Sequence, residues 1–269
     1  MSSDVNQQAR PCCRIGAVSY LNSKPLVFEL ARLAPEAKMV VDLPSRLAKS
    51  LAAGQLDVAL IPSIEYFQHP DYSIVSDACV ACEGPVRSVK LYSRVPIEEI
   101  RTLSLDEGSR ASAALVKIIL QEQYHLEPEY QTLPIDASLE SSQSDAVLLI
   151  GDRAMRPVNG SFHAVWDLGR QWTDWTGLPF VFAMWVARPG ADRQRLDTVL
   201  TAARDAGVKR FKEIARLEAT NVGISEASCL SYFQDHLTFH LGPRQREGLT
   251  RYYELAQQLG LAPGGVRLH

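Results

Sequence analysis

The sequence has no apolar run long enough to cross a membrane. Its most apolar stretch, Leu178 to Ala187, is about half the length that a spanning helix requires. The first residues, MSSDVNQQARPCC, are polar and lack the apolar core of a secretory signal. We therefore expect no membrane partner, a cytoplasmic location and a disordered tail over residues 1–13.

A surplus of positive charge is also missing. The 269 residues include 28 Lys and Arg against 31 Asp and Glu, which gives a net charge of −3. A broad nucleic-acid footprint requires a basic excess, so we expect no nucleic-acid partner, although the count does not exclude a local basic patch. A chain of this length can bury two ordinary cores without disulfides or metals. Its oligomeric state is not defined by the sequence.

Motifs for metal or redox chemistry are scarce. The five cysteines are an odd number and cannot all pair within one chain. Cys79 and Cys82 form a C-x-x-C without a second pair, and the Glu-Gly-Pro that follows breaks the helix a redox motif would need. His236 and His240 are four residues apart but lack the glutamate of a zinc helix. We expect the two cysteines to be structural and predict no metal site.

Strands and helices alternate from Arg14 onward. Apolar runs predict strands over 14–18, 38–43 and 57–62, and helices begin near Pro25 and Pro44 between them. This β-α-β-α-β order predicts a parallel sheet covered on both faces. Ligands gather at the carboxyl ends of such strands, which here are the loops at 19–23 and 62–65.

Two candidate crossings of the chain predict two domains. The chain is expected to cross between them near 93–98 and again near 174–180. A discontinuous first α/β domain would then comprise 14–96 and 179–269, and an inserted second one 97–178. The cleft between two such lobes is the default ligand site.

Six segments have patterns that point to a family. They are Gly16–Leu26 (GAVSYLNSKPL), Leu56–Tyr66 (LDVALIPSIEY), Ser88–Ser93 (SVKLYS), Gly108–Ser112 (GSRAS), Thr176–Ala183 (TGLPFVFA) and Leu249–Ala256 (LTRYYELA). Through them the chain resembles the chorismate dehydratase family, from about Arg14 to about Leu261. The first segment is the most specific. The resemblance implies an α/β, two-lobed fold of the type-II periplasmic-binding-protein kind with a central cleft.

The resemblance also implies a reaction. Chorismate loses water to give aromatic 3-[(1-carboxyvinyl)oxy]benzoate, in the futalosine route to menaquinone, and no cofactor is required because aromatisation drives the elimination. Two alternatives stay open: a non-catalytic solute-binding or sensor protein of the same fold, and the sister enzyme 1,4-dihydroxy-6-naphthoate synthase. The sister enzyme opens with a Ser-Pro-Cys-Pro-Asn-type loop, whereas this chain has Ser-Tyr-Leu-Asn at 19–22.

Asn22 is the candidate catalytic residue. Loop asparagines commonly satisfy turns, but the matching asparagine lines the active site in the family. A neutral amide can orient the substrate and hydrogen-bond a departing hydroxyl or a carboxylate.

The remaining candidates would bind the two carboxylates of chorismate. The start of a helix offers free amides and a positive dipole end, although serines there also serve as ordinary caps. The candidate substrate-binding residues are Ser19, Tyr20, Ser63, Ser88, Ser109, Arg110, Ala111, Ser112 and Gly151.

Two groups are candidates for the base that removes the ring proton. A protein carboxylate would repel a dianionic substrate, which disfavours Glu65, at the third-strand loop. The other candidate is the enolpyruvyl carboxylate of the substrate itself, with the protein supplying orientation.

Overall fold

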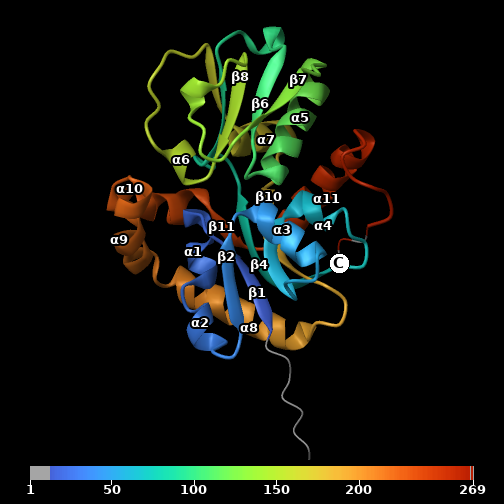
Figure 1. The fold of residues 1–269 in the computed structure, drawn as a ribbon, viewed down its shortest axis with the longest axis vertical. Helices are drawn as coiled ribbons and strands as arrows, with labels where there is room; N and C mark the ends of the chain where they lie inside the picture. Colours follow the sequence, from blue (N-terminus) through green and yellow to red (C-terminus); the bar gives the residue numbers. More distant parts are fainter. Residues whose placement is uncertain (1–12, 267, 269) are drawn as a thin grey trace, which may run out of the picture.

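The computed structural model describes residues 13–266 and 268. Two β-sheets form two lobes, which lie one above the other in Figure 1. This is the two-lobed α/β architecture expected from the sequence. The expected disordered tail, residues 1–13, lies outside the described residues except for Cys13.

The lower lobe in Figure 1 contains a six-stranded sheet in the order β11-β4-β10-β3-β1-β2. Its strands are β1 (Arg14–Val18), β2 (Lys38–Asp42), β3 (Val58–Pro62), β4 (Ser73–Cys82), β10 (Phe180–Ala187) and β11 (Thr238–His240). β1 pairs in parallel with β2 and β3, as the alternating opening predicts, whereas β10 runs antiparallel to β3 and β4. The carboxyl ends of β1 and β3 therefore lie at one edge, which faces the other lobe.

The upper lobe contains a five-stranded sheet in the order β7-β6-β8-β5-β9. Its strands are β5 (Val89–Ser93), β6 (Thr102–Asp106), β7 (Glu129–Leu133), β8 (Ala146–Ile150) and β9 (Ala164–Asp167). β6 pairs in parallel with β7 and β8, and β5 lies antiparallel between β8 and β9.

The position of β5 corrects one expected boundary. The expected first domain includes residues 14–96, but Val89–Ser93 pairs with two strands of the second sheet. The chain therefore crosses between the sheets after Cys82 and before Val89. A short buried strand pairs equally well in either sheet by its composition, so its partners are decided by tertiary packing. The division into independent domains, with the second boundary near residue 178, stays a prediction.

Helices cover both sheets. Those of the six-stranded lobe are α1 (Lys24–Val27), α2 (Leu30–Leu33), α3 (Pro44–Ala52), α4 (Ser63–Tyr66), α8 (Arg193–Val208), α9 (Phe211–Val222), α10 (Glu226–Ser231) and α11 (Pro243–Gln258). Those of the five-stranded lobe are α5 (Arg110–Tyr124), α6 (Asp152–Met155) and α7 (Leu168–Thr176). Short 3-10 turns occupy Leu21–Ser23, Ile97–Glu99 and Leu139–Ser141, and a π-helical turn occupies Tyr232–His236. α8 packs on β4, α3 on β3 and α11 on β10, while α5 contacts both α4 and α11 across the lobes.

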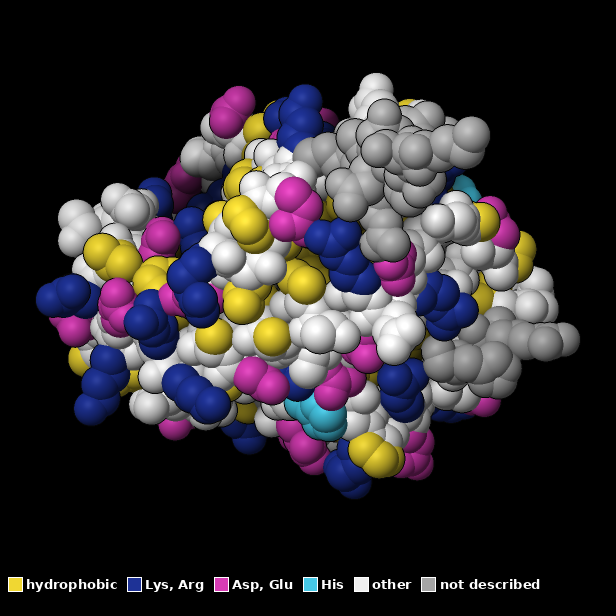
Figure 2. All heavy atoms as spheres, turned by 90° about the horizontal axis from the view of Figure 1, so that it is seen from below, with side chains coloured by type: hydrophobic (Ala, Val, Ile, Leu, Met, Phe, Trp, Pro, Cys, Tyr) yellow, Lys and Arg dark blue, Asp and Glu magenta, His cyan; other side chains and the backbone are white. Residues whose placement is uncertain are grey.

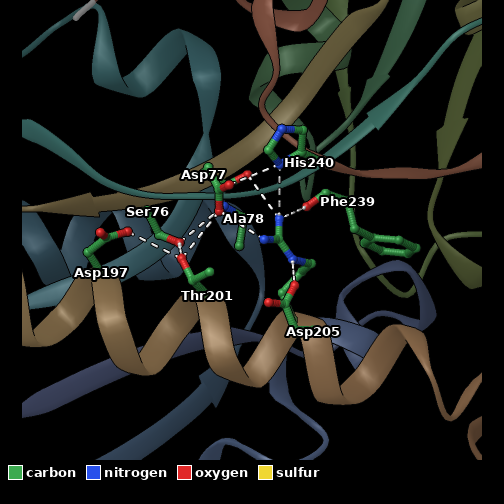
Figure 3. Close-up of polar contacts among 9 residues, drawn as sticks. Ser76, Asp77, Ala78, Asp197, Thr201, Asp205, Phe239 and His240 are labelled. Carbon is green, nitrogen blue, oxygen red and sulfur yellow. Dashed lines mark hydrogen bonds and ion pairs between the residues drawn. The ribbon is translucent and has the colours of Figure 1, made fainter.

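A polar network fixes the outer edge of the six-stranded sheet (Figure 3). Asp77 lies where the β4 register against β10 is interrupted by a bulge. Arg204 of α8, only 8% exposed, pairs with Asp77 at 3.1 Å and with Asp205 at 2.6 Å. Arg204 also donates to the carbonyl of Phe239 at 3.2 Å, and His240 lies 2.9 Å from Asp77. Two carboxylates thus compensate the guanidinium, and the short strand β11 is tied to β4 and α8.

The surface of the six-stranded lobe, seen from below in Figure 2, mixes charges of both signs. Lys and Arg side chains alternate with Asp and Glu, and apolar side chains appear between them in small groups. This face therefore has no single-sign patch among the side chains that the structure describes. Among the described residues, no helix is both long and apolar enough to span a bilayer.

Cys79 and Cys82 are both fully buried in β4. They are three positions apart on one strand, so their side chains point to opposite faces and cannot share a ligand. Burial raises the pKa of both thiols. Within residues 13–266 and 268, no group of three His, Cys, Asp or Glu side chains is arranged to hold a metal ion.

We predict that replacing both cysteines with alanine leaves kcat and KM near the wild-type values. The loss of two buried sulfur atoms should lower the free energy of unfolding by about 1–3 kcal/mol. Chemical denaturation measures the second effect, and metal analysis of the wild-type protein completes the test. Bound zinc that disappears together with the fold in the double variant would contradict a purely structural role.

Candidate active site

A pocket lies between the lobes, where the carboxyl ends of strands from both sheets meet. It holds about 540 Å³ of empty space, its open mouth included. Its wall comes from the ends of β1 and β3 in one lobe, and from the segments after β6 and β8 in the other. The lining residues are Val18, Tyr20, Asn22, Pro44, Leu60, Pro62, Val80, Ser88, Val89, Gly108, Ser109, Ala111, Ser112, Ile150, Gly151, Phe182 and Ala183.

Seven of the ten candidates line this pocket: Asn22, Tyr20, Ser88, Ser109, Ala111, Ser112 and Gly151. Three others are not among the lining residues. Ser63 is fully buried and donates to the carbonyl of Val181 at 2.7 Å. Ser19 continues the sheet, its amide donating to the carbonyl of Asp42, and Arg110 pairs with Glu65.

Asn22 lies in the 3-10 turn that follows β1. The hydroxyl of Ser23 closes this turn by donating to the carbonyls of Val18, at 2.6 Å, and Tyr20, at 2.9 Å. The side-chain oxygen of Asn22 is buried and has no hydrogen-bond partner among the described residues. A buried amide oxygen without a donor is costly, and one that lines a pocket is free to accept from a ligand.

The start of α5 forms a second wall of the pocket. Ser109 is its N-cap, accepting from the amide of Ser112 at 3.2 Å. The first-turn amides of a helix have no partner within the helix, and the dipole makes this end attractive to anions. None of the described residues that line the pocket has a charged side chain. Anion binding here would therefore depend on amides and hydroxyls.

A buried carboxylate that the sequence analysis missed shapes this wall. Asp106, 2% exposed, accepts from the amides of Gly108 at 2.9 Å and Ile150 at 3.0 Å. Arg153 donates to the same carboxylate at 2.6 Å. Burial raises the pKa of Asp106, and the arginine opposes that rise. Asp106 thereby joins the segments after β6 and β8, and only its position at the end of a strand could have indicated this role.

Tyr20 reaches across the cleft into the other lobe. A Cβ added to Gly108 would lie 2.6 Å from the Tyr20 hydroxyl, and one added to Gly151 would lie 2.9 Å from its ring. Both glycines are therefore required by the close approach of one aromatic ring. Burial raises the pKa of Tyr20, so its phenol stays protonated near neutral pH.

Several polar contacts join the two lobes around the pocket. Glu65 of α4 pairs with Arg110 of α5 at 2.7 Å, which places both side chains in an ion pair across the cleft. The Tyr252 hydroxyl donates to the carbonyl of Ala111 at 2.9 Å. The amide of Leu21 donates to Asp152 at 2.9 Å, and burial raises the pKa of that carboxyl group. The lobes are thus in direct contact.

The chain has a periplasmic-binding-protein-like fold, as expected from the sequence. The aliphatic sulphonate binding protein SsuA of Escherichia coli superposes with a TM-score of 0.62, at 18% identity over 96% of this chain and 95% of its own. Protein AF1704 of Archaeoglobus fulgidus superposes with a TM-score of 0.76, at 14% identity over 92% of this chain and 97% of its own.

The chain belongs to the menaquinone biosynthesis family, whose family model matches residues 13–258. A chorismate dehydratase of Thermus thermophilus is 31% identical over 265 residues, covering 92% of this chain and 95% of that protein. The resemblance found in the six sequence segments is confirmed at the level of the family.

Proposed function

We propose that this chain is a chorismate dehydratase, a hydro-lyase that converts chorismate to 3-[(1-carboxyvinyl)oxy]benzoate in menaquinone biosynthesis. The observation that carries the proposal is the relationship to the Thermus enzyme along nearly the whole of both chains. The proposal extends to the futalosine route and to a cytoplasmic location, where the free thiols of Cys79, Cys82 and Cys229 would stay reduced.

The chemistry of the pocket fits a substrate with two carboxylates and one hydroxyl. The first-turn amides of α5 can accept one carboxylate as an anion cradle. Ser88, which also lines the pocket, can donate its hydroxyl to the second. The Asn22 side-chain oxygen has no hydrogen-bond partner among the described residues and can act only as an acceptor. The ring hydroxyl is the one hydrogen-bond donor of dianionic chorismate, so it is the group that this oxygen would bind.

The elimination then balances without an added reagent. The C–H bond at the ether-bearing carbon breaks, and its electron pair forms the new ring double bond. The C–O bond of the ring hydroxyl breaks in turn, and the hydroxide leaves as water with the released proton. The enolpyruvyl carboxylate of the substrate is the proposed base, and the enzyme contributes orientation worth several kcal/mol of barrier.

Glu65 is the weaker candidate for the base. It does not belong to the pocket lining, and its carboxylate is paired with Arg110 at 2.7 Å. Removing a ring proton would require this ion pair to open and an anion to approach a dianion.

The test is a direct assay of turnover. Purified protein is mixed with chorismate, and the products are analysed by mass spectrometry. We expect a species lighter than chorismate by one water and with an aromatic absorption spectrum. Tight binding of chorismate without turnover would instead favour a sensor protein of the same fold.

A further inference from the structure

The segment that presents Ser88 to the pocket is held in an unusual conformation. It is the crossing between the two sheets, and it ends with Arg87 at φ 65°, in the left-handed region that a side chain with a Cβ rarely adopts. Such a residue persists only where its surroundings determine the conformation, and such strain gathers at ligand sites.

Two side chains impose this conformation from outside the segment. The carboxylate of Asp167, at the end of β9, accepts from the amides of Val86 at 2.8 Å and Arg87 at 2.6 Å. His236, at the end of the π-helical turn, donates from Nδ1 to the carbonyl of Pro85 at 2.8 Å. Asp167 belongs to the five-stranded lobe and His236 to the six-stranded lobe, so both lobes hold the backbone before Ser88.

The first residue of the same π-helical turn fixes the Ser88 side chain. The Tyr232 hydroxyl donates to Ser88 Oγ at 2.7 Å, and the two residues are 1% and 2% exposed. Burial raises the pKa of Tyr232, so the phenol keeps its proton. π-helical turns are rare and occur often at functional sites.

The direction of this hydrogen bond determines what Ser88 can offer a ligand. A serine hydroxyl has one proton and two lone pairs. One lone pair of Ser88 accepts from Tyr232, and no acceptor for its proton is found among the described residues. Since Ser88 lines the pocket, its proton is available to an acceptor there, such as a carboxylate oxygen.

We propose that Tyr232 is a positioning residue, which acts through Ser88 by directing the serine proton into the pocket as a donor to a substrate carboxylate. This inference rests on the proposed function, since it assigns Ser88 to one carboxylate of chorismate. A chain of two hydroxyls also strengthens the outer bond, because each donor polarises the next.

The test is a double-mutant cycle on chorismate turnover with Tyr232→Phe, Ser88→Ala and the double variant. Tyr232→Phe retains the ring and removes only the hydroxyl. The matched control is Tyr253→Phe, whose hydroxyl bonds the carbonyl of Pro263 and the amide of Val266 near the C-terminal end. Thermal unfolding of every variant monitors the fold, and calorimetry measures binding of the reaction product.

We expect Tyr232→Phe and Ser88→Ala each to raise KM about tenfold, the low end for a lost hydrogen bond to a charged group. The value of kcat should change less, because a carboxylate contact is made equally in the ground state and the transition state. Adding Tyr232→Phe to Ser88→Ala should have no further effect on KM or on product affinity. Tyr253→Phe should keep the wild-type KM.

Three outcomes overturn the inference. One is a wild-type KM in Tyr232→Phe. Another is an effect of Tyr232→Phe that is equally large with and without Ser88, because the tyrosine would then act by another path. The third is a wild-type KM in Ser88→Ala, which decides the matter even if Tyr232→Phe does not fold. Failure of the proposed function is distinct from all three, since the wild-type protein itself would then leave chorismate unchanged.

Discussion

Replacing Asn22 with alanine is expected to lower kcat for chorismate by on the order of a hundredfold or more, since misplacement of a reacting group by about 1 Å can cost that much. The side-chain oxygen of Asn22 is buried, lines the pocket and has no partner among the described residues. It would hold the ring hydroxyl in line for departure, which is orientation that the elimination requires. The aromatic product no longer carries this hydroxyl. Product binding should therefore suffer less than turnover. Steady-state assays and product calorimetry measure the two effects.

Two variants sharpen this prediction. Asn22→Asp retains the size of the side chain but sets an anion against a dianion, in a pocket whose described lining has no cation, so binding and turnover should both fall. Glu65→Gln should have a smaller effect than Asn22→Ala, because Glu65 is paired with Arg110 outside the lining. If Asn22→Ala retains a near-normal kcat while Glu65→Gln abolishes activity, the substrate-assisted account is wrong and Glu65 is the base.

The second large effect is expected from Gly151→Ala. Gly151 has φ 70° and ψ −154°, a region that is essentially restricted to glycine and costs another residue about 1–3 kcal/mol. The new methyl group would also lie 2.9 Å from the ring of Tyr20. Tyr20 or the whole lobe must then shift at the pocket wall. We expect kcat/KM for chorismate to fall at least about tenfold, since misplacement of about 1 Å can cost a hundredfold.

Gly177→Ala is the matched control. Gly177 also has φ 70°, at the C-cap of α7, but a Cβ there would meet nothing within 4 Å. This variant should lose about 1 kcal/mol of unfolding free energy by chemical denaturation and retain its kcat/KM. Equal loss of activity in both variants would mean that backbone strain alone, and not contact with Tyr20, explains the effect at Gly151.

Local signals made much of the fold and of one side of the pocket predictable. The alternating strands and helices from Arg14 to Pro62 form the parallel part of the six-stranded sheet, and Ser109 caps α5 as its position before an apolar helix indicates. Asn22 and Gly151 follow buried strands, and the ends of parallel strands meet at one edge of a sheet. These features depend on neighbours in the sequence.

Contacts between distant segments could not be predicted in this way. Ser63 and Arg110 lie in the right loops, yet Ser63 turns to the carbonyl of Val181 and Arg110 to Glu65. A polar side chain at a strand end takes the nearest partner that tertiary packing provides, and the sequence does not specify that partner. The sheet to which β5 belongs was likewise decided by contacts between distant segments.

By itself the sequence determined the α/β class and the loops in which the candidate site residues occur, because strand, helix and cap signals arise within a few residues. The family followed from the resemblance of its six motifs. Tertiary structure alone decided how those loops are held. Tyr20 packs against Gly108 and Gly151, Asp106 accepts from the backbone of the pocket wall, and Tyr232 donates to Ser88. Ser88 and Tyr232 are 144 positions apart. Such hydrogen bonds join segments that only the folded chain brings together, in an interior where a buried polar group without a partner is costly.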